Sequence, residues 1–126
     1  MAGGSSSTDK QNGIYLPGAE NCSNKLDYDA AYNCIQTNLS LIISQSKANR
    51  SKATKQLTET LNAAKTWGIY TDKEGDTVHD NCGSLNNATN INTCAQTLNV
   101  MVIQKKEARK QDEQGVSVLK GLLGKQ

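Results

Sequence analysis

The sequence predicts an all-α fold, in which two tandem disulfide-stapled helical repeats form a small helical bundle. Three observations predict it: a duplicated cysteine spacing, apolar residues that recur every three or four positions, and a shortage of aromatic side chains. The 126 residues include no Phe, one Trp and four Tyr. A β-sandwich would need alternating aromatic and β-branched residues. Helices packed through Leu, Ile, Val and Ala are therefore the better expectation.

The duplication is centred on the cysteines. Asn21-Cys22 is followed by Cys34, and the same spacing separates Asn81-Cys82 from Cys94. These four cysteines are all that the chain contains. A gapless alignment of residues 21–48 with 81–108 also matches four further pairs: Gln36 with Gln96, Thr37 with Thr97, Ile43 with Ile103, and Ala48 with Ala108.

An even number of cysteines at matched spacing in a small polar domain is typical of disulfides formed in an oxidising compartment. We expect the local pairs Cys22–Cys34 and Cys82–Cys94, because a unit that staples itself can be duplicated without depending on its sister. Zinc is a rival interpretation, although structural zinc ligands usually come in pairs two to four residues apart. Free thiols are the remaining alternative.

The cysteine spacing also predicts where the helices begin. A disulfide holds its two Cα atoms about 5.5 Å apart, whereas twelve residues of helix would separate them by about 18 Å. The chain must therefore double back after Cys22, and we expect a helix to start near Asp27. The aligned residue in the second repeat is Asn87. Both are good N-cap residues, because their side-chain oxygens accept hydrogen bonds from exposed backbone N–H groups.

Helical spacing of apolar residues continues beyond each cysteine. Residues 44–52 are polar, so the first repeat is either a helical hairpin that turns near residues 46–51 or one long helix. In the second repeat a polar run covers residues 104–114, and Gly115 is a candidate break. The apolar segment 116–123 is expected to close the core as a terminal helix, or else to dock on a membrane surface or a partner with the help of Lys120 and Lys125. The residues expected to face the core are Ala31, Ile35, Leu39, Ile42, Ile43, Ala53, Leu57, Leu61, Ala64, Trp67, Ile91, Ala95, Leu98, Met101 and Val102.

These patterns divide the chain as follows. Residues 1–18 are a flexible leader or tether, and residues 19–126 are a single helical domain. Within that domain, repeat one covers residues 21–70, a connector covers 71–80, and repeat two covers 81–126. The stretch from Gly68 to Gly83 is expected to be rich in turns. An antiparallel four-helix bundle and a hairpin of two long helices are the candidate architectures.

The N-terminal run Ala2-Gly3-Gly4-Ser5-Ser6-Ser7 resembles the start of a mature bacterial lipoprotein, in which a lipidated cysteine precedes a small residue and a Gly/Ser tether. The resemblance covers seven residues of low complexity, and Met1 stands where the acylated cysteine would be. It implies membrane attachment through a lipidated N-terminus, and Ala2 in place of Asp implies the outer membrane. An artificial leader or a plain secreted protein is the alternative.

The sequence contains no motif of an enzyme. A phosphate-binding glycine loop, a zinc-protease helix and a nucleophile elbow are all missing, and no cofactor or metal is expected. The net charge is only +2, and the short basic stretch at Lys105-Lys106 and Arg109-Lys110 is too mixed for nucleic acid.

The connector departs from this charge balance. It carries Asp72, Glu74, Asp76 and Asp80 against Lys73. A calcium loop is excluded, because its sixth position would be Thr77 rather than glycine. Trp67 and Tyr70 precede this acidic stretch and could anchor a partner. We therefore expect Trp67, Tyr70 and the four acidic residues to form a partner-binding face.

Together these features predict a non-enzymatic protein-binding domain of a bacterial envelope lipoprotein, on the periplasmic side or the surface of the outer membrane, whose partner is another envelope protein. Small helical lipoproteins of this kind serve as accessory or pilot proteins of secretion, pilus or conjugation machines, which is what the resemblance implies. One alternative is a periplasmic inhibitor or immunity protein against a toxin or a lysozyme-like enzyme. A second alternative is a small-ligand carrier.

Overall fold

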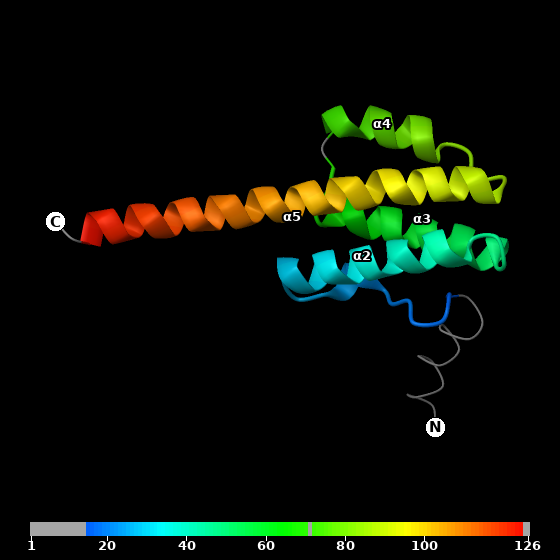
Figure 1. The fold of residues 1–126 in the computed structure, drawn as a ribbon, viewed down its shortest axis with the longest axis horizontal. Coiled ribbons are helices and arrows are strands. Elements are labelled where there is room, and N and C mark those ends of the chain that lie inside the picture. Colours follow the sequence, from blue (N-terminus) through cyan, green and yellow to red (C-terminus); the bar gives the residue numbers. More distant parts are fainter. Residues whose placement is uncertain (1–14, 71, 125–126) are drawn as a thin grey trace, which may run out of the picture.

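The computed structural model describes the backbone of residues 15–70 and 72–124, and their side chains except at 72–76, 116–118 and 124. Within this part of the chain the fold is all-α, and no strand is present. A short 3-10 helix, η2 (Cys22–Asn24), precedes the helices α2 (Tyr28–Gln45), α3 (Arg50–Thr66), α4 (Asp72–Cys82) and α5 (Ala88–Gly124). Successive helices run in opposite directions, and α5 projects far beyond the others (Figure 1).

The predicted disulfides and helix starts are confirmed. Cys22 is bonded to Cys34 and Cys82 to Cys94, with Cα–Cα distances of 5.6 and 4.8 Å. Because all four sulfurs are paired, neither free thiols nor zinc thiolates apply. Asp27 Oδ1 accepts a hydrogen bond from the backbone N–H of Ala30 at 2.8 Å, and Asn87 Oδ1 accepts one from Asn90 at 2.9 Å. The two repeats therefore begin their helices in the same way.

The core lies where α2, α3 and the first half of α5 meet. Helix α5 contacts α2, α3 and α4, whereas α4 contacts α5 alone among the described helices. The predicted core positions are mostly confirmed. The fully buried ones are Ala31, Ile35, Leu39, Ile42, Ala53, Leu57, Ala64, Ile91, Ala95, Leu98 and Val102, and Ile43, Leu61, Trp67 and Met101 pack partly buried against them.

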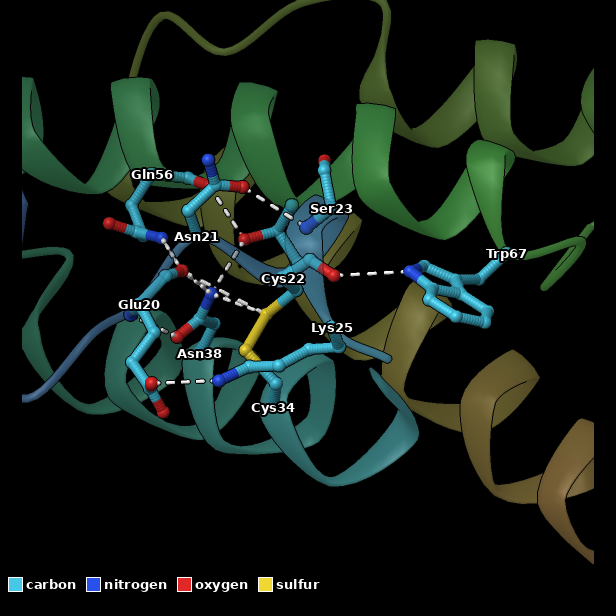
Figure 2. Close-up of a disulfide and its surroundings, with 10 residues drawn as sticks. Glu20, Asn21, Cys22, Ser23, Lys25, Cys34, Asn38, Gln56 and Trp67 are labelled. Carbon is cyan, nitrogen blue, oxygen red and sulfur yellow. Dashed lines mark hydrogen bonds and ion pairs between the residues drawn. A yellow bond between two sulfur atoms is a disulfide. The ribbon is translucent and has the colours of Figure 1, made fainter. Parts of the chain in front are cut away.

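A polar network fixes the first disulfide within this core (Figure 2). Asn38 is 1% exposed and bonds both backbone groups of Glu20: its Oδ1 accepts from the N–H at 3.1 Å, and its Nδ2 donates to the carbonyl at 2.8 Å. Trp67 Nε1 donates to the Cys22 carbonyl at 3.1 Å. The segment before α2 is thus held by α2 on one side and by the end of α3 on the other.

The first repeat is a helical hairpin, one of the two predicted forms. Helix α2 ends at Gln45 and α3 begins at Arg50. Helix α3 ends at Thr66, and Gly68, two residues later, has a φ of +68°, a left-handed conformation that suits glycine. The N–H groups of Gly68 and Ile69 return hydrogen bonds to Lys65 and Ala64.

Three predictions about the rest of the chain are wrong. Residues 71–80 were expected to be a turn-rich connector, but Asp72–Cys82 is helix α4. Gly115 was a candidate break, but α5, which has 37 residues in all, continues through it to Gly124. The terminal segment was expected to close the core, yet Leu119, Leu122 and Leu123 are 60, 57 and 68% exposed.

The leader also ends earlier than predicted. Tyr15 and Leu16 are 4 and 0% exposed and belong to the core, so the packed domain includes residues before 19. Residues 1–14, which carry the rest of the predicted leader and the run that resembles a lipoprotein, lie outside the described residues.

Candidate functional site

The candidate site is a groove at the end of the bundle where α5 leaves it. Its volume is about 550 Å³. It is lined by residues from the start of α2, the end of α3 and the middle of α5: Tyr28, Tyr32, Trp67, Gly68, Lys105, Ala108, Arg109, Asp112 and Glu113. We call these residues the aromatic groove. Two smaller hollows of about 460 and 270 Å³ adjoin it and share Arg109 and Glu113 with it.

Three aromatic rings form the wall of the groove. Tyr28 and Tyr32 lie one turn apart on α2, with ring centroids separated by 5.8 Å. The Tyr28 ring also meets the Trp67 ring edge to face, with centroids 5.3 Å apart. Such aromatic pairs add about 0.5–1.5 kcal/mol beyond area burial. The Trp67 ring is held in this position by a hydrogen bond, which its indole N–H donates to the backbone carbonyl of Cys22.

Helix α5 supplies the charged side of the groove. The Arg109 guanidinium carbon lies 3.7 Å from the centroid of the Tyr28 ring, which is a cation–π contact. Arg109 Nε also pairs with Glu113 Oε1 at 3.2 Å, one turn further along the helix. The Arg109 side chain is 40% exposed and the Glu113 side chain 65%. The ion pair therefore adds little stability and remains accessible to another molecule.

A second contact holds α5 against α2 at this end. Lys106 Nζ donates to Asn33 Oδ1 at 3.0 Å and to Gln36 Oε1 at 3.3 Å. The helices that line the groove thus also contact each other beside it.

Burial affects two tyrosines near this end of the bundle. Desolvation raises the pKa of Tyr32, although the neighbouring Arg109 charge acts in the opposite direction. Desolvation also raises the pKa of Tyr70. Both phenols therefore remain neutral hydrogen-bonding groups at physiological pH.

The structure divides the predicted partner-binding face. Trp67 lines the aromatic groove, while Tyr70 packs partly buried against the core. Asp80 is exposed on α4. Asp72, Glu74 and Asp76 begin the same helix, but their side chains lie outside the described residues. Helix α4 lies on the side of α5 that faces away from α2 (Figure 1).

Sequence reasoning missed Tyr28, Tyr32 and Arg109. Two local patterns could have indicated them: the aromatic pair Tyr28 and Tyr32 at one-turn spacing, and the opposite charges of Arg109 and Glu113 at the same spacing. That these two pairs meet is a property of the tertiary fold.

The described residues contain no group of three or more His, Cys, Asp or Glu side chains placed to hold a metal ion. Nor does any helix among them carry an apolar stretch sufficient to cross a membrane. The two disulfides are consistent with an oxidising location outside the cytoplasm. No family model, curated protein or solved structure matches the chain.

Proposed function

We propose that this chain is a non-enzymatic protein-binding domain of the bacterial envelope and that its partner docks in the aromatic groove. The observation that carries the proposal is the grouping of Trp67, Tyr28 and Arg109 at one concave, accessible surface. Trp, Tyr and Arg are the residues most often responsible for binding energy in protein interfaces, and they act best within a pocket.

The shape of the groove favours a helical or extended segment with apolar anchors. The three aromatic rings line the groove together with Lys105 and Arg109, and the Arg109 guanidinium lies over the Tyr28 ring. Asp112 and Glu113 add acidic groups to the same helix. A partner segment with apolar residues at helical spacing and charges of both signs would fit this surface.

The remaining parts of the proposal concern location. The disulfides support an oxidising compartment, and the resemblance of residues 2–7 supports a lipoprotein of the outer membrane, with a role as an accessory or pilot protein of an envelope machine. Incorporation of radiolabelled palmitate into the natural protein in its own cells tests the lipid anchor. A protein without label would contradict it.

A small-ligand carrier is less favoured, because charged side chains make up four of the nine residues that line the aromatic groove and six of the seven that line the adjoining hollow of about 460 Å³. An inhibitor that used the acidic connector, residues 71–80, would bind on the α4 side instead. Neutralising Asp72, Glu74, Asp76 and Asp80 distinguishes that alternative from binding at the groove.

Capture from an envelope extract tests the binding face. The immobilised wild-type protein is compared with Tyr28→Ala and Arg109→Glu, and with Lys55→Glu as a matched control on an exposed position of α3 outside the groove. We expect both groove variants to lose a defined partner at least tenfold while the control retains it. Equal capture by all four proteins, with all four folded, would contradict the proposal.

A further inference from the structure

The two disulfides are copies of one motif, but their surroundings differ. Each joins cysteines that are twelve residues apart in the sequence. In the first disulfide Cys22 is 2% exposed and Cys34 is 6% exposed. In the second, Cys94 is 0% exposed, whereas Cys82 is only partly buried. The second disulfide therefore has one partly exposed end, and the first has none.

The first disulfide is enclosed by two helices. The segment that carries Cys22, η2, contacts both α2 and α3. The Asn38 side-chain amide approaches Cys22 Sγ at 3.2 Å, and the Trp67 indole N–H donates to the Cys22 carbonyl (Figure 2). A thiol in solution therefore reaches this bond only when the core itself opens.

The second disulfide lacks this enclosure. Helix α4, which ends at Cys82, contacts α5 alone among the described helices, and it lies on the outer side of α5 (Figure 1). The residue aligned with Asn38 is Leu98, whose side chain has no polar group to hold the cysteine. Among the described side chains of α4, Val78 is the only one that is buried. The attachment of α4 to the bundle thus depends heavily on its disulfide.

We propose that the Cys82–Cys94 disulfide is a thiol-exchange site, at which a dithiol reductant opens the bond and releases α4 from the bundle. The Cys22–Cys34 disulfide stays closed under the same conditions. The inference is independent of the proposed role of the aromatic groove, because the residues that line the groove come from α2, α5 and the end of α3.

The exchange begins at Cys82, because a thiolate attacks the sulfur that it can reach. The thiolate of the reductant bonds to Cys82 Sγ, the bond between the two protein sulfurs breaks, and Cys94 leaves as a thiolate. The second thiolate of the reductant then bonds to the first reductant sulfur and displaces Cys82. Two electrons pass from the dithiol to the protein, and the two protons that the dithiol loses balance those that the protein thiolates take from water. The products are two protein thiols and the disulfide of the reductant.

The opened bond changes the fold locally. Helix α4 has 11 residues, and an isolated helix of this length is not stable in water. Released α4 therefore unravels, while α2, α3 and α5 keep the core that they share. Reoxidation restores the helix, so the redox state of the surroundings decides whether α4 belongs to the bundle.

Timed reduction of the oxidised, folded protein by dithiothreitol tests the selectivity. Free thiols are blocked with N-ethylmaleimide at intervals, and peptide mass spectrometry compares the two disulfides. We expect Cys82–Cys94 to open about tenfold faster than Cys22–Cys34, and the two rates to become similar in urea, where the fold protects neither bond. Equal rates in the folded protein, or a difference that persists unchanged in urea, overturn the proposal.

The point of attack is tested with reduced glutathione, a monothiol whose mixed disulfide is trapped by acid and located by mass spectrometry. We expect the glutathione on Cys82. A mixed disulfide on Cys94 overturns the order of the two steps.

Amide hydrogen exchange tests the release of α4. After selective reduction, peptides from residues 72–82 should exchange about tenfold faster, while peptides from α2 and α3 keep their rates. The variant Cys82→Ser with Cys94→Ala should show the same pattern without a reductant, and reoxidation of the wild type should restore protection. An α4 that stays protected with the bond open overturns the proposal, as does a loss of protection throughout α2 and α3.

Discussion

Replacing Asn38 with leucine tests whether the first repeat depends on its polar network. The duplication suggests this change, because the aligned residue of the second repeat is Leu98, which is fully buried in the core. The two positions share a helical register but not a role. Asn38 pairs with the backbone of Glu20, next to the Cys22–Cys34 disulfide (Figure 2).

The magnitude follows from the bonds that are lost. With leucine at position 38, the backbone N–H and carbonyl of Glu20 would lose their hydrogen bonds to the Asn38 amide. Each part-buried polar group left unpaired lowers the free energy of unfolding by about 1–3 kcal/mol. Gln56 Nε2 also approaches the Glu20 carbonyl, but at the long distance of 3.5 Å, so it compensates little. The additional apolar side chain recovers about 1–2 kcal/mol. We expect a net loss of about 2 kcal/mol in the free energy of unfolding.

The assay is urea unfolding of the oxidised protein, followed by far-UV circular dichroism. The midpoint should fall while the slope stays constant, since the surface exposed on unfolding hardly changes. The reverse substitution, Leu98→Asn, is the matched control. It should also destabilise, because an amide would be buried among apolar side chains. An Asn38→Leu protein as stable as the wild type, or more stable, would refute the role given to the network.

Three further predictions concern the fold. Asp27→Ala and Asn87→Ala should each lower the free energy of unfolding by about 1 kcal/mol, because each removes an N-cap bond; an unchanged urea midpoint for both would contradict the equivalence of the repeats. Replacing Cys22 and Cys34 with Ala should cost about 3 kcal/mol in the chain-entropy model, and peptide mapping of the oxidised protein should find no bond between the repeats. Burial and the hydrogen bond to Glu59 raise the pKa of Tyr15 to about 12. Since the unfolded state ionises first, the contribution of Tyr15 to stability is complete below pH about 10 and is lost as the pH rises to about 12. Tyr15→Phe should flatten the decline of the melting temperature over that range, and an equally steep decline would argue against it.

Much of the fold could be predicted because its signals are local. The disulfides follow from the repeated spacing, and the helix starts follow from N-cap chemistry at Asp27 and Asn87. Helix α4 could not be predicted in this way, because Val78 is its only described side chain in the core apart from the partly buried Cys82. One apolar contact gives no periodic pattern.

The length of α5 was missed for a related reason. The amphipathic pattern stops after Val102, because no described side chain of α5 beyond it is buried. The residues that follow are mostly strong helix formers, and these continue the helix through Gly115. Apolar residues at helical spacing indicate which part of a helix packs against the core. They do not indicate where an exposed part of the helix ends.

The site was only partly predictable. Trp67 was predicted both to face the core and to belong to a partner-binding face, and it packs partly buried against the core while lining the groove. Its partners Tyr28 and Arg109 come from segments about forty residues away in either direction along the chain. Their meeting depends on how α2, α3 and α5 pack together.

The central claim is that the aromatic groove binds protein. The most direct test places a photo-reactive residue at Ala108, which lines the groove, in the natural protein in its own cells, and compares it with the same residue at Val100, outside the groove. We expect a protein adduct with a partner from position 108, and little or none from position 100. Adducts from position 100 alone would contradict it.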